Sequence, residues 1–347
     1  MKTACLVAER TIEIRDVPDP VCPDDGLILA VKACGICGSD IRRWKEGPPQ
    51  GISSITPGHE LSGIVVETGA NVEKFAVGDR LAVAPDVHCG HCYYCRRGMY
   101  NLCDNLKFLG ITPGYPGGFA EKMAISGQVL ANGIVHRMPN SLAFSEGAFA
   151  EPCCSVLACH NRAGTTLGDT IVVMGAGPIG CLHIVVAKAR GARVIVSEPV
   201  RLRREMAEKF APDFVIDPSN QDLSTLVKNA TAGTGADIVI CANPVAGTQT
   251  QAVEIVRKGG KVILFGGLPK ANPMTTLDGN RIHYNEIEVI GSFSYHPTVH
   301  ELALRLLANK IIPAERFITH TFKLDETGKA FETAGERQAL KVIIELD

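Results

Sequence analysis

A glycine-rich turn in the middle of the chain restricts the possible folds more than any other feature. Residues 175–180 read G-A-G-P-I-G, follow the apolar run 170–174 and precede a segment with helical character. In a strand–turn–helix unit, the first glycine permits a tight turn, the second lets a pyrophosphate approach the backbone, and the third permits close packing of helix on strand. The helix start then offers free N–H groups to the phosphates. We therefore expect a dinucleotide site at Gly175, Gly177, Pro178, Ile179 and Gly180.

The segments around this turn alternate between strand and helix, which predicts βαβ units and a parallel sheet. The expected strands are 170–174, 193–197, 237–241, 261–265 and 287–291, and the expected helices are 179–190, 201–210, 248–257 and 298–309. The first 150 residues contain instead short β-type runs divided by turns, at 12–17, 26–34, 63–68, 80–83 and 119–125. A chain of 347 residues is long enough for two domains. We expect a β-rich domain of residues 1–152 and 292–347, and an α/β domain of residues 153–291.

The end of the second expected strand of the α/β domain indicates which dinucleotide binds. Glu198 stands there, 18 residues beyond Gly180. Its carboxylate can accept hydrogen bonds from both ribose hydroxyls and would repel a 2′-phosphate, so we expect NAD rather than NADP. Three arginines that follow could hold a phosphate or simply form a solvated helix face: Arg201, Arg203 and Arg204. We include Arg203 among the expected cofactor residues.

Composition excludes several classes of partner. The chain is 46% hydrophobic and 21% charged, with a net charge of -2, so binding to nucleic acid or to an anionic membrane has no electrostatic support. Residues 170–187 contain no Asp, Glu, Lys or Arg, but their glycines, proline and histidine favour a strand–turn–helix over a membrane span. The apolar run at the N-terminus is too short for a signal peptide. We expect a cytoplasmic protein.

Four cysteines crowd into one short segment with the spacing C-x2-C-x2-C-x7-C. The chain has thirteen cysteines, an odd number, and cytosolic thiols stay reduced, so metal binding is favoured over disulfides. Four thiolates this close can surround one tetrahedral Zn²⁺ in a closed, structural site. An iron–sulfur cluster and four unrelated cysteines are the alternatives. The predicted ligands are Cys89, Cys92, Cys95 and Cys103.

A second set of metal ligands is distributed over three motifs. Cys37 is followed two residues later by the hydroxyl of Ser39, His59 is followed by Glu60, and Glu151 stands at the change from β-rich to α/β sequence. Cysteine, histidine and carboxylate match a catalytic zinc with three protein ligands and an open position. Each residue also has an ordinary structural interpretation: a buried cysteine, a core histidine, a glutamate at a helix start.

Together these motifs resemble the zinc-containing medium-chain dehydrogenases. Gly58-His59-Glu60 is followed by Gly63, Gly69 and Val72, and the other motifs occur in the order of that family. Within it the chain is most similar to the polyol branch, represented by sorbitol dehydrogenase, which has Gly-Ile-Cys-Gly-Ser-Asp near its start. That branch also has Glu-Pro where simple alcohol dehydrogenases carry a cysteine ligand. The resemblance implies an α/β fold with a GroES-like β-rich catalytic domain, formed by both chain ends, and an inserted Rossmann domain.

The resemblance also implies the chemistry. Cys37, His59 and a glutamate would hold a catalytic zinc; both Glu60 and Glu151 are retained as candidates for the glutamate. A zinc ion lowers the pKa of a bound alcohol, whose hydride would pass to the nicotinamide while Ser39 relays the proton. We therefore expect two Zn²⁺ ions per chain, NAD as cofactor, a small alcohol as substrate, and a homodimer or homotetramer.

The substrate is expected to be a polyol or another sugar-derived secondary alcohol. Phe293 and Tyr295, in Gly-Ser-Phe-Ser-Tyr, are candidate substrate contacts. Sorbitol dehydrogenase has an arginine where Ser294 stands and a tyrosine near Arg43, so sorbitol itself is in doubt. Arg42 and Arg43 could receive a phosphate or carboxylate, or be ordinary exposed arginines. An L-threonine dehydrogenase, a general secondary-alcohol dehydrogenase, and a zinc-bearing structural or sensing relative without turnover are the alternatives.

Overall fold

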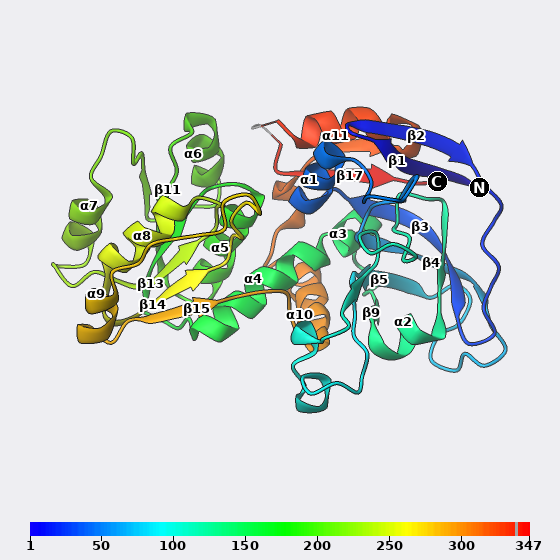
Figure 1. The fold of residues 1–347 in the computed structure, drawn as a ribbon, viewed down its shortest axis with the longest axis horizontal. Coiled ribbons are helices and arrows are strands. Elements are labelled where there is room, and N and C mark those ends of the chain that lie inside the picture. The colour runs from blue at the N-terminus through cyan, green and yellow to red at the C-terminus, as the bar shows by residue number, and fades with distance from the viewer. Residues whose placement is uncertain (337–338) are drawn as a thin grey trace. The chain divides into compact units, whose positions relative to one another are not determined.

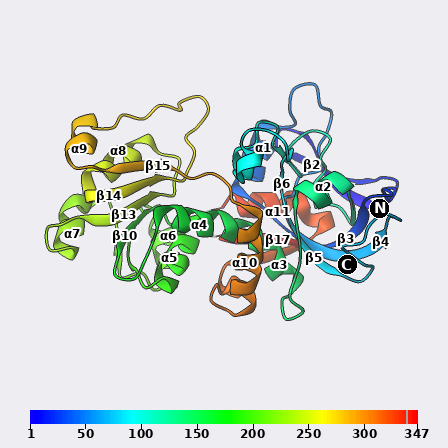
Figure 2. The same ribbon diagram turned by 90° about the horizontal axis from the view of Figure 1, so that it is seen from below.

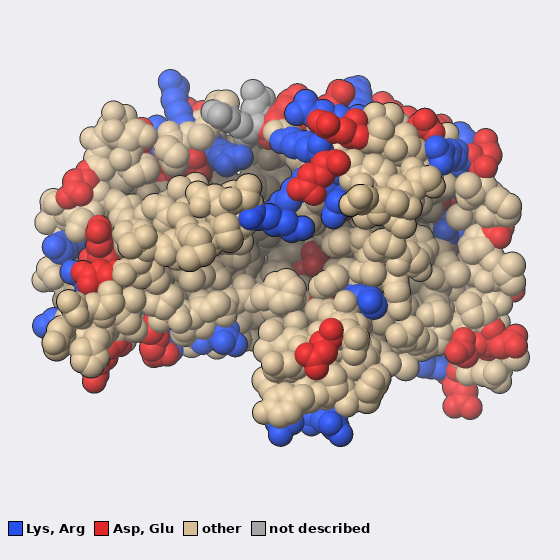
Figure 3. Space-filling model, in the orientation of Figure 1, with Lys and Arg blue, Asp and Glu red and all other residues tan. Residues whose placement is uncertain are grey.

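The computed structural model describes residues 1–336 and 339–347, which form two compact units. The first unit comprises Met1–Cys154 and Tyr295–Asp347, and the second comprises Ser155–Ser294. Figure 1 labels most of the helices and many of the strands of both units. On the face drawn in Figure 3, basic and acidic side chains are interspersed.

Strands from both ends of the chain make up the first unit. Its strands are β1 (Lys2–Ala8), β2 (Thr11–Asp16), β3 (Leu27–Gly35), β4 (Glu60–Thr68), β5 (Arg80–Ala84), β6 (Asp86–Val87), β7 (Lys107–Phe108), β8 (Lys122–Ile125), β9 (Ile134–Arg137), β16 (Ile318–Lys323) and β17 (Lys341–Glu345). Its helices are α1 (Gly38–Glu46), α2 (Gly127–Asn132), α3 (Phe144–Ala148), α10 (Pro297–Ala308) and α11 (Thr327–Ala334). Single 3-10 turns occur at Cys95–Arg97, Tyr100–Leu102, Ala314–Arg316 and Leu324–Glu326.

A seven-stranded sheet organises this unit, in the order β16-β17-β3-β4-β5-β9 with β8 also paired to β3. The C-terminal strand β17 pairs antiparallel with β3, and Figure 1 shows the two lying side by side. β3 and β4 pair antiparallel, with Gly35 opposite Glu60. Strand β3 begins Leu-Ile-Leu-Ala-Val and is buried along most of its length, with Ala30 and Lys32 half-buried. Packing in the core therefore holds β3 in place, and β3 in turn positions the segment that follows it, which contains Cys37 and the start of α1.

The second unit is built on a parallel sheet in the order β12-β11-β10-β13-β14-β15. Its strands are β10 (Thr170–Met174), β11 (Arg193–Ser197), β12 (Phe214–Ile216), β13 (Ala236–Cys241), β14 (Val256–Leu264) and β15 (Glu288–Gly291). Its helices are α5 (Pro178–Ala189), α6 (Arg201–Glu208), α7 (Leu223–Ala230), α8 (Ala246–Ile255) and α9 (Gly279–Tyr284). Helix α4 (Ala150–Ala163) begins in the first unit and continues into the second.

The strand order of the second unit reverses at β10, which is where dinucleotides bind in sheets of this kind. β11 and β12 lie on one side of β10, and β13, β14 and β15 lie on the other. Figure 2 shows α5 and α8 on opposite faces of this sheet. Covered on both faces, its central strands read as continuous apolar runs, and Ile171, Val172 and Val173 are fully buried. The predicted α/β class with a parallel-sheet domain is confirmed.

The structure contains helices that the short β-type runs of the first 150 residues did not indicate. Helix α1 follows Cys37 directly, and α4 starts at Ala150, one residue before Glu151. In the second unit, β12, α7 and α9 add to the predicted elements. Within the described ranges, no helix combines the length and the apolar composition that crossing a bilayer requires.

Candidate functional site

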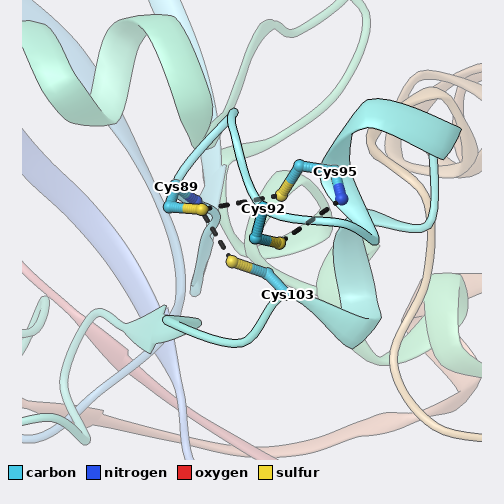
Figure 4. Close-up of side chains that lie close together, drawn as sticks. All are labelled: Cys89, Cys92, Cys95 and Cys103. Carbon is cyan, nitrogen blue, oxygen red and sulfur yellow. Dashed lines mark hydrogen bonds between the residues drawn. The ribbon is translucent and has the colours of Figure 1, made fainter.

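The four clustered cysteines converge on one point (Figure 4). Their sulfur atoms all lie within 4.8 Å of one another. The sulfurs of Cys89 and Cys95 are 4.0 Å apart, about twice the length of a disulfide bond. The backbone N–H of Cys89 donates to the sulfur of Cys103 at 3.2 Å, and that of Asn105 donates to the same sulfur at 3.3 Å.

Backbone donors and burial act in opposite directions on the four thiols: the donors lower the pKa of Cys89 and Cys92, whereas burial raises that of Cys95 and Cys103. Hydrogen bonds from backbone N–H groups, that of His91 foremost, lower the pKa of the Cys89 thiol to about 6. Zinc is bound by deprotonated cysteines in tetrahedral sites of four ligands, and N–H donors to sulfur orient such ligands. The donor set, its spacing and its hydrogen bonds therefore fit a structural zinc ion.

The second predicted ligand set is assembled by β3, α1 and β4. Cys37 stands at the N-cap of α1, two residues after β3 ends at Gly35. Glu60 is the first residue of β4, and His59 immediately precedes it. The ligand atoms of Cys37, His59 and Glu60 lie within 4.8 Å of one another, and His59 and Glu60 are buried. A Cβ atom at Gly35 would collide with the carboxylate of Glu60, so the glycine opposite Glu60 leaves room for this side chain.

Asp40 supports this set, although the sequence analysis gave it no role. It is buried, and its Oδ2 accepts a hydrogen bond from the backbone N–H of Cys37 at 2.9 Å. Its Oδ1 lies 3.3 Å from Nδ1 of His59. A carboxylate on one ring nitrogen of a ligating histidine orients the ring and leaves the other nitrogen for the metal. The available signal was its position three residues after an N-cap, where an acidic side chain commonly reaches back.

Lys341 is the second supporting residue that sequence reasoning missed. It begins β17 and is 4% exposed. Its Nζ lies 2.7 and 2.6 Å from the two carboxylate oxygens of Glu60, and it also donates to the carbonyl of Ile36 at 3.1 Å. The available signal was a lysine at the start of an apolar strand, since a buried lysine is almost always paired.

The electrostatics of the set favour a cation. Burial acts to lower the pKa of His59, but the negative charges of Asp40 and Cys37 outweigh it and raise that pKa well above its usual range. Burial likewise acts to lower the pKa of Lys341, and the charges of Glu60 and Cys37 raise it instead. Both basic side chains thus lie in a field of negative charge. A divalent ion would neutralise it, so the residues present fit a catalytic zinc.

Glu151 lies near this set without being one of its three close members. Its Oε1 accepts a hydrogen bond from the hydroxyl of Tyr295 at 2.7 Å, and both side chains are buried. Burial and the charge of Glu60 raise the pKa of Glu151 to about 7. In the structure, Tyr295, a predicted substrate contact, is therefore hydrogen-bonded to Glu151, a predicted metal ligand. Phe293 belongs to the second unit and is 59% exposed.

The other two predicted residues of α1 face different surroundings. Ser39 Oγ lies 3.4 Å from Nε2 of His59, beside the ligand set. Nη1 of Arg43 lies 3.5 Å from a carboxylate oxygen of Glu46, and the Arg43 side chain is 29% exposed.

The glycine loop of the second unit has the local geometry that its spacing predicts. Gly175 has φ 109°, a value that favours glycine, and a Cβ atom at Gly180 would collide with the carbonyl oxygen of Gly175. A Cβ atom at Gly177, the N-cap of α5, would meet no atom of the described residues within 4 Å. The loop is therefore tight where the helix crosses it and open where a phosphate would lie.

Glu198 is buried at the end of β11 and contacts this loop. One carboxylate oxygen accepts from the backbone N–H of Ala176 at 2.8 Å, and the other accepts from that of Val200 at 2.9 Å. Of the arginines that follow, Arg201 pairs with Glu205 at 2.7 Å. Arg204 pairs with Asp217 at 2.9 Å. Arg203 is half-buried on α6, and its contact with the cofactor stays a prediction.

Known proteins resemble the chain along its whole length. The model of the alcohol dehydrogenase GroES-like domain matches residues 23–139, and that of the zinc-binding dehydrogenases matches residues 178–309. D-arabitol-phosphate dehydrogenase of Enterococcus avium is 35% identical over 335 residues, which cover 95% of this chain and 92% of that protein. Sorbitol dehydrogenase of Bacillus subtilis is 34% identical over 354 residues, which cover 99% and 97% of the two chains.

A solved structure agrees with these relatives. The crystal structure of a zinc-binding dehydrogenase from Sinorhizobium meliloti, bound to NADP, has a TM-score of 0.90 and 32% identity, with 99% of each chain covered. The predicted family is confirmed, as are zinc and a nicotinamide dinucleotide as its cofactors. The chain belongs to the zinc-binding dehydrogenases with a GroES-like domain and is an oxidoreductase of that family.

Proposed function

We propose that this dehydrogenase transfers a hydride between a polyol, or another sugar-derived secondary alcohol, and NAD. The observation that carries the proposal is the convergence of Cys37, His59 and Glu60, with Glu151 nearby, in a chain that also has an intact dinucleotide loop. The names of the relatives from E. avium and B. subtilis support the class of substrate. We take residues 1–152 and 292–347 as the catalytic domain and residues 153–291 as the cofactor domain.

We assign the catalytic zinc to Cys37, His59 and Glu60, because Glu151 lies outside that close set and is hydrogen-bonded to Tyr295. When bound, the ion supplies Lewis-acid chemistry and lowers the pKa of the alcohol hydroxyl. Asp40 orients the ring of His59 from the Nδ1 side. A carboxylate has about four lone-pair positions, so Glu60 can serve a metal while Lys341 holds both of its oxygens. The second zinc belongs to Cys89, Cys92, Cys95 and Cys103.

Two residues would handle protons and hydroxyl groups beside the metal. Ser39 Oγ, 3.4 Å from Nε2 of His59, is placed to accept the proton of the alcohol and pass it outward. Glu151 has one oxygen occupied by Tyr295, and its second oxygen is available to a hydroxyl of the substrate or to water. We retain Phe293 as a substrate contact.

The cofactor assignment rests on Gly175, Gly177, Pro178, Ile179 and Gly180, with Glu198 and Arg203 beside them. The negative charge of Glu198 would repel a 2′-phosphate, which favours NAD. We further propose a homodimer or homotetramer, on the basis of the family resemblance. We propose a cytoplasmic location because none of the thirteen cysteines, which all lie within the described ranges, forms a disulfide.

The decisive experiment is a substrate panel with the zinc-replete enzyme and NAD, followed by the absorbance of NADH. The panel contains D-arabitol, xylitol, sorbitol, aldonates, polyol phosphates, L-threonine and 2-butanol. The Cys37→Ser variant serves as the blank, because it lacks a ligand of the catalytic zinc. We expect the highest kcat/KM for a polyol or one of its derivatives. A higher kcat/KM for threonine or butanol, or no turnover that depends on Cys37, would reject the proposal.

A further inference from the structure

Helix α1 presents one particular face to the catalytic ligand set. Ser39 Oγ lies 3.4 Å from Nε2 of His59, and Asp40 Oδ1 lies 3.3 Å from Nδ1 of the same ring. These two residues differ by about 100° around the helix axis, since an α-helix has about 3.6 residues per turn. Viewed along the axis of α1, the His59 ring therefore lies in the sector between Ser39 and Asp40.

Arg43 lies in the same sector of α1, one helical turn further along. With Ser39 at zero, Arg43 stands at about 40°, Asp40 at about 100° and Arg42 at about -60°. Arg43 is half-buried, whereas Arg42 is exposed. Side chains on a helix lean toward its N-terminus and cover the preceding turn, which for Arg43 is the turn of Ser39. In the structure the Arg43 guanidinium turns instead toward Glu46, three residues further along α1. Rotation about its side-chain bonds would bring it toward the metal-binding end of α1, which lies about 6 Å away along the axis, the rise of four residues.

The guanidinium of Arg43 is only loosely engaged. Its Nη1 lies 3.5 Å from a carboxylate oxygen of Glu46, longer than the 2.7–2.9 Å typical of a charge-assisted hydrogen bond. The Glu46 side chain is 48% exposed, and exposed ion pairs of this kind contribute little to stability. A stronger anion could therefore displace Glu46. An arginine fork binds phosphate and carboxylate groups through two parallel hydrogen bonds.

We propose that Arg43 binds an anionic group at the far end of the substrate chain, so that the enzyme acts on sugar alcohols that carry a terminal phosphate or carboxylate. The reacting hydroxyl lies at the Cys37–His59 end of α1 and the anion lies one helical turn away, a distance that a short polyol chain can span. This inference rests on the proposed function and adds to it the charge of the substrate.

Matched substrate pairs test the inference: D-arabitol against D-arabitol 1-phosphate, sorbitol against sorbitol 6-phosphate, and galactitol against galactonate. For the wild-type enzyme we expect kcat/KM to be at least about tenfold higher for the anionic member, and Arg43→Gln to reduce that ratio by about 10–100-fold, the range of a lost hydrogen bond between charged groups. Arg43→Lys should retain part of the preference for the anionic member of each pair. Arg42→Gln, one position away on the opposite side of Ser39, is the matched control and should leave it unchanged.

The outcomes separate this inference from the proposed function. If neutral polyols are oxidised but the wild-type enzyme shows no preference for either anion, or Arg43→Gln keeps the preference, the role of Arg43 is rejected and the proposed function stands. If no member of any pair is oxidised, the proposed function itself is rejected. A larger loss for the phosphate pairs than for galactonate identifies phosphate as the anion, and the reverse identifies carboxylate.

Discussion

Lys341 holds both carboxylate oxygens of Glu60, at 2.7 and 2.6 Å, although 281 residues separate them in the sequence. Both side chains are almost completely buried. The pairing depends on two neighbouring strand pairs, β17 with β3 and β3 with β4. Lys341 thus links the C-terminal strand to a candidate zinc ligand at the other end of the chain.

In protein from which the catalytic zinc has been removed, replacing Lys341 by methionine should lower the free energy of unfolding by about 3–5 kcal/mol, because it leaves the carboxylate of Glu60 buried without a positive partner. The measurement is the free energy of unfolding in urea. In the double variant Lys341→Met/Glu60→Gln the unpaired charge is absent, so part of the loss should be recovered. The control is Lys323→Met, which removes an exposed ion pair with Asp347 and should change stability by no more than about 1 kcal/mol. Equal effects of Lys341→Met and Lys323→Met would contradict this account.

Cys92→Ser should remove one of two bound zinc ions and lower the melting temperature. A closed thiolate site contributes folding free energy, and a hydroxyl is a poor substitute for a thiolate ligand. Metal content by plasma emission spectroscopy and thermal unfolding are the measurements. Cys22→Ser, outside the four-cysteine cluster, is the control and should keep both ions. An unchanged zinc content in Cys92→Ser would remove the structural site from the account.

Glu198→Ala should shift the ratio of kcat/KM values from NAD toward NADP, by about tenfold or more, because it removes both a ribose acceptor and the repulsion of a 2′-phosphate. The variant also frees the N–H groups of Ala176 and Val200, so some loss with both cofactors is expected. Glu198→Gln keeps an acceptor oxygen without the charge and separates the two effects. An unchanged ratio in both variants would show that the carboxylate does not select the cofactor.

Local motifs in the sequence were sufficient for part of the site. The glycine loop and the four-cysteine cluster are each short, and their chemistry is local, so spacing alone could indicate them. The residues around Cys37 and His59 also had ordinary structural interpretations, and the family resemblance was needed to identify them as metal ligands. The contacts of Lys341 and Tyr295 could not be inferred in this way. They join residues 281 and 144 positions apart, and such contacts depend on strand register and tertiary packing that spacing does not encode.

Helix α1 shows a second limit of prediction from sequence. The segment after Cys37 contains Gly38, Ser39 and Trp44, which have modest helix propensity, and the helix is only nine residues long. Its formation is supported by Asp40, which accepts from the backbone N–H of Cys37, and by burial of Trp44. Tertiary packing thus determined a helix that local preference did not indicate, and that helix carries both Ser39 and Arg43.

His183 should make the protein sensitive to acid. Burial lowers its pKa to about 3, against about 6.5 in an unfolded chain. Between these values the unfolded state binds a proton that the folded state does not, so stability is fully present above about pH 6.5 and falls by up to about 1.4 kcal/mol per unit as the pH decreases toward 3.

The test replaces His183 by glutamine, which can still hydrogen-bond to Nε2 of His160, the partner of His183 Nδ1 at 3.1 Å. The free energy of unfolding in urea, measured at pH 7, 6, 5 and 4.5, should fall less steeply in this variant than in the wild type. His283→Gln removes an exposed histidine of the same unit and should keep the wild-type slope. If His183→Gln also keeps that slope, the acid sensitivity has another origin.

Ser39→Ala tests the step in which the alcohol loses its proton. Ser39 Oγ lies 3.4 Å from Nε2 of a zinc-ligand candidate and can both accept and donate a hydrogen bond. Its removal should lower kcat for alcohol oxidation by about 10²–10⁴-fold, the usual contribution of general acid–base catalysis, while zinc content and NAD affinity stay the same. Part of the loss should return at higher pH, where solvent base can accept the proton.

Ser39→Thr keeps the hydroxyl on the same helix and should keep most of the activity, which distinguishes a relay from simple packing. The alternative is that Ser39 only forms part of the first turn of α1, in which case alanine would change stability slightly and kcat hardly at all. The comparison is valid when hydride transfer limits the rate, which a deuterium isotope effect on the carbinol carbon establishes. A folded, zinc-replete Ser39→Ala enzyme with such an isotope effect and an unaltered kcat at neutral pH would exclude the relay.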